Sequence, residues 1–415
     1  MRRFSVPSSK SISNRLLIIE QLSKNKVGRL INLSMAEDTL LMQRLIGELN
    51  QGNTNRFYCD NAGTVSRFII GLLSITKGEY IVDGSQRLRQ RPMKPLIETL
   101  NKLGVGINCL ERESYLPIEI CSSGEINGGE IDIDTNLSSQ FLTSLLLIAP
   151  KFSKTSIFNL SGSNISLPYI EMSVELIREM GIDIEFKDNK IRVEPGEYNL
   201  KDIIIEADWS SASFGYELAY ITKEEVFIPN LKPNSIQGDS ISKEYFSYFG
   251  IETIFNQDGG ILIPKQETSI EDLEFNIGNC PDLFLPLAVC GALSKRRIVF
   301  KNTSTLKHKE SNRIEAMSTE LKKMGVEILT DRDVRVDRES ARPGSLQLIM
   351  LSCSEGRLQF SMFGPLKILR CLSFKLPAAS ARNDWSNTSI AHCHTVLDFA
   401  RCVVARRTLL GRSFL

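Results

Sequence analysis

Positively charged side chains stand at the beginning of segments that have the pattern of an apolar helix. Lys10 and Arg15 follow the polar turn of SSKSISNRLLIIEQL, and Arg67 follows that of NAGTVSRFIIGLLSI. Capping explains the serines and asparagines, but a cation in the first turn opposes the helix dipole by roughly 0.3 kcal/mol or more. An anion can bind both the free amides and the cations. We therefore predict anion-binding helix starts; for Arg15, a side chain that snorkels into solvent is the alternative. A similar polar turn opens each of three further segments, SSQFLTSLLLIAP, DWSSASFGYELAYI and CPDLFLPLAVCGAL.

A second group of cations lies in GSQRLRQRPMKPLIETL, where Arg87, Arg89 and Arg91 occupy alternate positions. Alternate side chains share one face of an extended chain, so the segment predicts three like charges side by side. Such charges repel one another unless an anion lies among them. A solvated edge strand is the alternative for Arg87 and Arg89.

The segment LKHKESNRIEAM adds Lys307, Lys309 and Arg313, and Glu310 is the only carboxylate between them. Considered alone, Glu310 is also explained as a first-turn acid that a helix dipole favours. Together with the capped helix starts, these basic clusters indicate a deep site for a small substrate that carries several phosphates or carboxylates.

The composition argues against nucleic acid as the partner. Lys and Arg number 50 against 49 Asp and Glu, and two Trp are too few for an aromatic stacking platform. The phosphate-binding pattern GxxxxGK[ST] does not occur in the sequence. Nine scattered Cys without CxxC spacing indicate reduced thiols, and the adjacent residues His392 to His394 cannot all face one metal ion. We therefore expect no metal site.

The sequence also predicts no membrane contact. The longest mainly apolar stretches, Phe141 to Pro150 and Asp282 to Leu293, are shorter than the ~20 residues that span a bilayer. The residues after Arg2 and Arg3 lack the apolar core of a secretory signal. We expect a cytoplasmic monomer.

One pattern recurs four times and predicts the elements that position these residues. An amphipathic helix ends at a glycine and an alternating apolar segment follows, in LNKLGVGIN, IREMGIDIEF, FSYFGIETIF and LKKMGVEIL. Glycine suits the left-handed conformation just past a helix, and the alternation predicts a strand. The spacing gives a unit of about seventy residues, so the chain would hold nearly six units. We expect an α/β (α+β) fold with two domains of three units each. The four glycines are Gly104, Gly181, Gly250 and Gly325.

The composition changes near residue 330. Residues 1–330 carry a net charge of −5, whereas residues 331–415 carry +6, with 11 Arg, only 2 Lys and four of the nine Cys. The repeat pattern also stops there. A nucleic-acid-binding tail, a fused segment and a change of reading frame would each explain this change.

Ten short segments, in this order, resemble the EPSP synthases of the enolpyruvyl transferase family. The resemblance runs from about residue 5 to residue 330 and implies two domains, each built from three βαβαββ repeats. The expected domains are residues 8–231, residues 1–7 with 232–330, and an atypical tail, 331–415, in place of the final repeat. The segments are PSSKSISNR, AEDTLLM, DNAGTVSRF, RLRQRPMKPLIETLNKLG, SSQFLTSLLL, SLPYIEM, DWSSASF, NSIQGD, CPDLFLPLAV and KESNRIEA.

The resemblance implies transfer of the enolpyruvyl group of phosphoenolpyruvate to the 5-hydroxyl of shikimate 3-phosphate, with release of phosphate and without a metal or organic cofactor. It implies that Asp282 takes the proton of the attacking hydroxyl, that Glu310 protonates the methylene carbon and that Lys10 takes part in catalysis. General acid and base roles require two carboxylates in different environments, and Glu310 is flanked by cations while Asp282 opens an apolar helix. The phosphoenolpyruvate site would comprise Lys10, Gly63, Thr64, Arg91, Gln140 and Arg313, and the shikimate 3-phosphate site Ser11, Arg15, Ser138, Ser139, Gln140, Tyr169, Asp282 and Lys309.

The tail departs from the family pattern. It has neither the Asp-His-Arg-Met segment nor the late Lys that contribute to the phosphoenolpyruvate site in the family. Before the tail, Thr305 is a smaller departure, because several members have Asn at that position. Two hypotheses remain: an active transferase, or an inactive or truncated member that binds shikimate 3-phosphate without turnover. The enzyme that acts on UDP-N-acetylglucosamine is a more distant alternative, because GSQRLRQRP has no counterpart of its Cys loop.

Overall fold

The computed structural model describes residues 1–24, 27–134, 138–162, 166–266, 272–294, 296–309, 311–323, 325–330, 333–337, 348–354 and 357–363. All of these belong to one compact unit, Met1–Arg370. Within these ranges, no helix is long and apolar enough to span a membrane.

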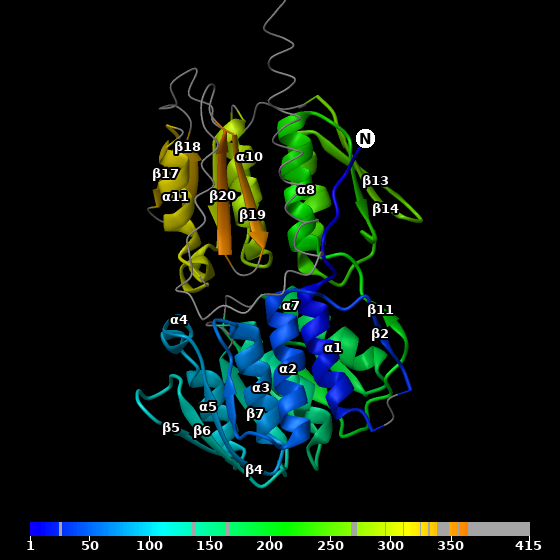
Figure 1. Cartoon of the computed structure of the whole chain (residues 1–415), viewed down its shortest axis with the longest axis vertical. Helices are drawn as coiled ribbons and strands as arrows, with labels where there is room; N and C mark the ends of the chain where they lie inside the picture. The colour runs from blue at the N-terminus through cyan, green and yellow to red at the C-terminus, as the bar shows by residue number, and fades with distance from the viewer. Residues whose placement is uncertain are drawn as a thin grey trace, which may run out of the picture. The chain divides into compact units, whose positions relative to one another are not determined.

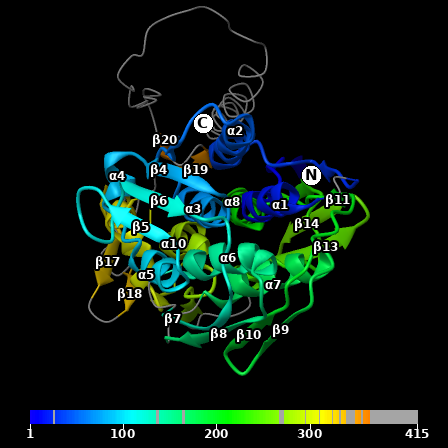
Figure 2. The same cartoon turned by 90° about the horizontal axis from the view of Figure 1, so that it is seen from below.

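In the described residues, four sheets have four strands each and share one strand order. Figures 1 and 2 show how the helices and strands are arranged. In each sheet the first two strands are parallel, and the third and fourth run antiparallel to their neighbours. The sheets are β3(Arg56–Tyr58)–β4(Gly78–Asp83)–β6(Ile118–Ser122)–β5(Gly106–Cys109), β7(Gly129–Asp134)–β8(Ser156–Ser161)–β10(Lys190–Val193)–β9(Ile184–Lys187), β1(Arg2–Arg3)–β12(Val226–Pro229)–β14(Gly259–Pro264)–β13(Ile251–Asn256) and β15(Leu273–Asn276)–β16(Ile298–Lys301)–β18(Val334–Asp337)–β17(Glu327–Thr330).

Helices connect the strands as the βαβαββ pattern requires. A parallel pair cannot be joined by a tight turn, so a helix crosses between its strands. In three sheets these crossover helices are α3(Gly63–Ser74), α6(Ser139–Ile148) and α10(Phe284–Leu293), and the second helices are α5(Lys94–Lys102), α7(Leu167–Glu179) and α11(Arg313–Lys323). In the remaining sheet, α8(Trp209–Thr222) leads into β12, and the short α9(Ser242–Tyr245) precedes β13.

The four repeated glycines lie where the sequence pattern predicts them, between a helix and the strand that follows. Their φ angles are 92° at Gly104, 89° at Gly181, 75° at Gly250 and 75° at Gly325. A side chain would be strained in this left-handed region, so glycine ends each helix and starts the strand.

The remaining N-terminal elements are α1(Lys10–Leu22), α2(Glu37–Gln51) and a two-stranded parallel sheet of β2(Leu30–Ile31) and β11(Ile203–Ile204). Two backbone hydrogen bonds join the residues just before α1 to the residues just before α8. The amide of Ser9 donates to the carbonyl of Glu206 at 2.9 Å, and the amide of Asp208 donates to that of Pro7 at 2.9 Å. The boundary expected at residue 7 falls at these contacts, and the amide of Ala207 donates to the carbonyl of Asn230 at 3.3 Å, beside the boundary expected at residue 231. The division into domains stays a prediction.

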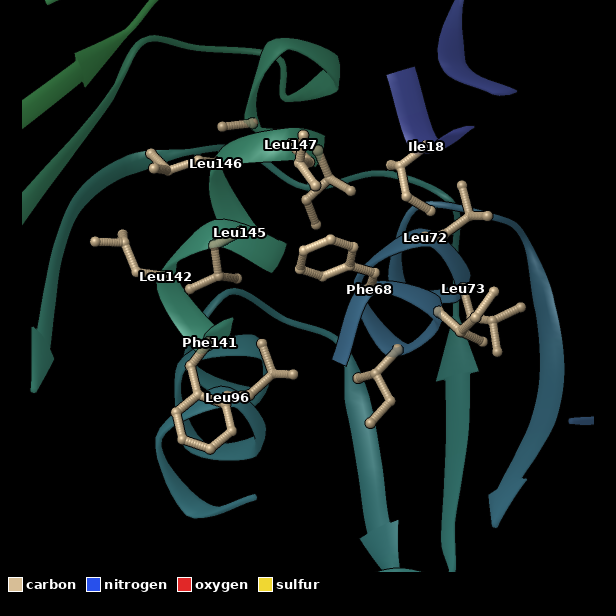
Figure 3. Packing of buried hydrophobic residues seen from close by; sticks show 14 of the residues in the cluster. Ile18, Phe68, Leu72, Leu73, Leu96, Phe141, Leu142, Leu145, Leu146 and Leu147 are labelled. Atoms are coloured by element: carbon tan, nitrogen blue, oxygen red, sulfur yellow. The ribbon is translucent and has the colours of Figure 1, made fainter. Parts of the chain in front are cut away.

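An apolar core fixes the helices that carry candidate site residues (Figure 3). Nearly every residue of α3 and α6 is buried, including Phe68 and Leu145. Burial of one such side chain contributes ~1.5–3 kcal/mol. The two helices also touch closely, because a Cβ on Gly71 would lie 2.4 Å from Oγ of Ser144. The packing therefore holds the first turns of α3 and α6 in fixed positions.

The fold continues past the composition break. Strand β18 pairs with β16 and β17 and completes the fourth sheet. A hairpin of β19(Leu348–Ser354) and β20(Arg357–Phe363) follows. The sequence RNDWSNTS and the His392 to His394 segment lie outside the described residues.

Candidate active site

All five polar turns lead into helix starts, as expected, but a side chain caps the helix in only three of them. Helix α1 begins at Lys10, and its N-cap Ser9 accepts a hydrogen bond from the amide of Ile12 at 3.4 Å. Helix α6 begins at Ser139, and its N-cap Ser138 accepts from the amide of Gln140 at 3.2 Å. Helix α8 begins after its N-cap Asp208.

Lys10 lies between two acids. Its amide donates to Oδ2 of Asp208 at 3.3 Å, and its ammonium lies 3.2 Å from Oδ2 of Asp38. Asp208 also accepts from the amide of Ser211 at 2.7 Å, so one carboxylate joins the starts of α1 and α8. Burial raises the pKa of Asp208, and its hydrogen bonds and Lys10 oppose that rise. The Lys10 side chain remains 44% exposed, so it is accessible to a ligand.

The start of α3 is a cationic cradle, formed by Gly63, Arg67 and Arg91. A Cβ on Gly63 would lie 2.4 Å from Nη1 of Arg91 and 2.7 Å from Nη1 of Arg67. Only glycine leaves room for both guanidinium groups. Arg67 donates to the Gly63 carbonyl at 2.9 Å. The side-chain Nε2 of Gln140 donates to Oγ1 of Thr64 at 3.1 Å, which brings the start of α6 to this cradle.

A second group, the carboxylate cluster, consists of Tyr169, Asp282, Lys309 and Arg313. Asp282 lies in the short helix η4(Pro281–Leu283), just before α10 rather than inside it. Its Oδ1 accepts a short hydrogen bond from Nη1 of Arg313 and lies 3.8 Å from Nζ of Lys309. The Tyr169 hydroxyl donates to Oδ2 at 3.1 Å. The cluster thus joins α7, η4, the loop before α11 and the first residue of α11.

The charges of this cluster decide its protonation. Burial by itself raises the pKa of Asp282, but Lys309 and Arg313 together outweigh burial and hold that pKa well below its usual range. Lys10 acts in the same direction. Burial, reinforced by Asp282, holds the pKa of Tyr169 well above its usual range. At neutral pH, Asp282 is therefore an anion and Tyr169 a neutral hydrogen-bond donor.

Arg15 is buried, so the snorkelling alternative is wrong. Its guanidinium donates to Oγ of Ser173 at 2.8 Å and to the carbonyls of Ser11 at 2.7 Å and Tyr169 at 3.1 Å. Burial lowers its pKa to about 10, so it stays charged at neutral pH. Arg15 therefore joins α1 to the first turn of α7 and holds the backbone of Tyr169.

The expectation of an extended chain at Arg87 and Arg89 is wrong. Gln86–Arg89 form a short helix, α4, whose N-cap Ser85 accepts from the amide of Leu88 at 3.3 Å. Arg89 pairs with Asp83 at 2.6 Å, away from the cradle. The three arginines therefore do not share one face.

Sequence reasoning missed Asp239, although the recognised segment NSIQGD contains it. Asp239 is 3% exposed and accepts a short hydrogen bond from the Ser210 hydroxyl. Burial and the neighbouring Asp282 raise its pKa to about 7. It is a second buried acid beside the carboxylate cluster.

Glu310, the expected acid, lies outside the described residues. A polar cavity of about 680 Å³, lined by Gln21, Asn50 and Asn53 among others, includes none of the predicted site residues. That cavity is therefore separate from the cradle and from the cluster.

Comparison with known proteins gives one family. The model of EPSP synthase (3-phosphoshikimate 1-carboxyvinyltransferase) matches residues 42–348. Relatives described as 3-phosphoshikimate 1-carboxyvinyltransferase include one from Bacteroides fragilis (strain YCH46), 36% identical over 79% of this chain and 78% of its own length. Another, from Aliivibrio salmonicida, is 30% identical over 80% and 82%. A solved EPSP synthase from Acinetobacter baumannii shares the fold, with a TM-score of 0.66, 21% identity and 81% of each chain covered.

Proposed function

The chain belongs to the EPSP synthase family, and from this membership we propose that it transfers the enolpyruvyl group of phosphoenolpyruvate to the 5-hydroxyl of shikimate 3-phosphate. Phosphate is the second product. The observation that carries the proposal is the Asp282 carboxylate, held between a tyrosine hydroxyl and two cations.

Two anionic substrates in one site repel each other, so their charges must be offset before reaction. The cradle and the cluster supply fixed cations for this purpose. We assign the phosphoenolpyruvate site to Lys10, Gly63, Thr64, Arg91, Gln140 and Arg313, and the shikimate 3-phosphate site to Ser11, Arg15, Ser138, Ser139, Gln140, Tyr169, Asp282 and Lys309.

In this proposal Asp282 is the general base. The 5-hydroxyl oxygen forms a bond to C2 of phosphoenolpyruvate, its proton passes to Asp282, and C3 gains a proton from Glu310, the acid that the family resemblance implies, to give a tetrahedral intermediate. One C3 proton then returns to Glu310 as the C2–O bond to phosphate breaks, which restores the double bond, and the proton on Asp282 leaves with the phosphate. Without bound substrate, Asp282 is a weak base, because Lys309 and Arg313 lower its pKa. Substrate anions that share these cations would raise that pKa toward the value a base needs.

The test is a phosphate-release assay on the full chain, run beside calorimetric titration with shikimate 3-phosphate. We expect release that depends on both substrates. Asp282→Asn should lower kcat by about 10²- to 10³-fold, as loss of a catalytic group typically does. Asp258→Asn, at an exposed turn, is the matched control and should leave kcat unchanged.

One observation favours a second candidate. The family match ends at residue 348, so the last segment has no counterpart in the family model. A member that binds shikimate 3-phosphate without turnover would give heat on titration and no phosphate. That pair of results would contradict the proposed transferase activity, and rapid release would exclude the inactive form.

The proposal includes a cytoplasmic monomer. Light scattering coupled to size-exclusion chromatography tests the oligomeric state of the purified chain. Action on UDP-N-acetylglucosamine is not favoured, because the relatives found are described as 3-phosphoshikimate 1-carboxyvinyltransferases.

A further inference from the structure

The three arginines of one short segment have three different environments. Arg91 lies against Gly63 in the cradle. Arg89 pairs with Asp83 and with Glu111, at 2.6 Å and 2.8 Å. Arg87 instead donates from Nη2 to the backbone carbonyl of Lys309 at 3.0 Å. None of the substrate-site residues assigned above is Arg87, so this contact has no role yet.

Arg87 lies in the short helix α4, which several contacts hold in place. Helix α4 is capped by Ser85, and its Leu88 is fully buried. The salt bridges of Arg89 fix the same turn to β4 and to the Glu111 loop. Because α4 is anchored by these neighbours, loss of the Arg87 side chain should leave the turn in place.

Lys309 is the residue whose position this hydrogen bond controls. It follows the short helix η5(Ser304–His308) and has extended backbone angles, φ −77° and ψ −171°. Its carbonyl therefore lies outside the regular hydrogen bonds of η5 and α11, and in this half-buried position Arg87 supplies a donor for it. The ammonium at the other end of the same residue lies 3.8 Å from Asp282.

We propose that Arg87 is a positioning residue that holds the Lys309 backbone, so that the Lys309 ammonium lies beside Asp282 and the shikimate 3-phosphate site is complete. The proposal rests on the proposed function. It gives Arg87 a task that is separate from substrate contact: it joins α4 to the loop before α11, which carries Lys309.

Other contacts support this division of labour. The Tyr169 hydroxyl reaches Asp282, and Oγ of Ser166 donates to the carbonyl of Gly278 at 3.3 Å. Both start from α7 or its N-cap and fix the segment before α10. The Arg87 hydrogen bond fixes a different segment, the one before α11. Loss of Arg87 should therefore loosen Lys309 while Asp282 keeps its bond to Tyr169.

The kinetic test compares Arg87→Ala and Arg87→Lys with the full parent chain. We expect Arg87→Ala to raise the KM for shikimate 3-phosphate about 10-fold or more, with a smaller change in kcat, since the site must order before it binds. Arg87→Lys should restore most of this loss, because an ammonium also donates to a carbonyl. Arg178→Ala is the matched control, since Arg178 also donates to a backbone carbonyl, that of Ile184 at 3.2 Å.

Hydrogen–deuterium exchange gives a readout that does not need turnover. In the unliganded chain, Arg87→Ala should exchange faster than the parent in the peptide that spans residues 306–314. The melting temperature should stay close to that of the parent.

The outcomes separate the two proposals. A parent chain that neither binds shikimate 3-phosphate nor releases phosphate contradicts the proposed function, and exchange in residues 306–314 still tests Arg87. Unchanged exchange and unchanged KM in Arg87→Ala overturn the positioning role. Equal losses in Arg87→Lys and Arg87→Ala also overturn it, because they indicate that the guanidinium itself contacts substrate.

Discussion

The cradle at the start of α3 and the carboxylate cluster before α10 use similar cations in opposite ways. In the cradle, Arg67 donates to neutral oxygens, and Arg67 and Arg91 both crowd the same glycine. In the cluster, Lys309 and Arg313 are paired with Asp282. In the cluster the cations therefore set the protonation state of an acid, whereas in the cradle the Arg67 guanidinium binds the neutral oxygens of Gly63 and Ser66.

Removal of a cradle cation should have the largest effect. Arg91→Ala should lower kcat/KM by about 10²- to 10³-fold, since a fixed donor that stabilises developing charge is lost. The phosphate-release assay measures the rate, and thermal melting should show an intact fold. Arg91→Lys should recover little, because a single ammonium does not reproduce the planar guanidinium. Near-normal turnover in Arg91→Ala would mean that the cradle is not the phosphoenolpyruvate site.

A change in the shape of the cradle should have an intermediate effect. In Gly63→Ala, the added Cβ would collide with the Arg91 guanidinium, 2.4 Å away, so that guanidinium must move. We expect the KM for phosphoenolpyruvate to rise about 10-fold, as for a misplaced positioning group.

Gly71→Ala is the control for this shape change. Its Cβ would meet Ser144, also at 2.4 Å, but inside the core of α3 and α6. It should lower the melting temperature more than it changes KM. The reverse pattern for the two glycines would contradict the assignment of Gly63 to the site.

The smallest expected effect concerns the acid beside the cluster. The pKa of Asp239 is raised to about 7, far above its unfolded value, so the folded state binds more protons between about pH 4 and pH 7. Stability from this group is therefore present at low pH and is lost as pH rises toward 7. The neighbours Asp282 and Asp208 raise this pKa, and Lys309 opposes them.

Asp239→Asn removes this dependence. Asparagine can still accept from Ser210, so the melting temperature of the variant relative to the parent should rise by a few degrees from pH 5 to pH 8. Thermal melting at several pH values measures this, with the exposed Asp258→Asn as the reference. A constant difference across this range would show that Asp239 does not titrate there.

Local signals in the sequence predicted much of the fold. The four glycines were expected at helix ends, and each has a positive φ. Ser9, Ser138 and Asp208 cap the helices that their segments predict. Alternation failed at Arg87 and Arg89, because RLRQR fits a strand face as well as a helical turn. Burial of Leu88 and the hydrogen bond to the Ser85 cap stabilise the helical turn instead of a strand.

The sequence by itself determined the family, the repeat, the helix starts and the types of residue available for chemistry. The tertiary structure decided which charges meet. Tyr169 and Asp282 are 113 positions apart, and Arg87 and Lys309 are 222 apart. Such distances depend on how whole helices and sheets pack, and the pKa of Asp239 and the burial of Arg15 depend on that packing as well. Local pattern cannot supply them, because desolvation and Coulomb interactions act through space rather than along the chain.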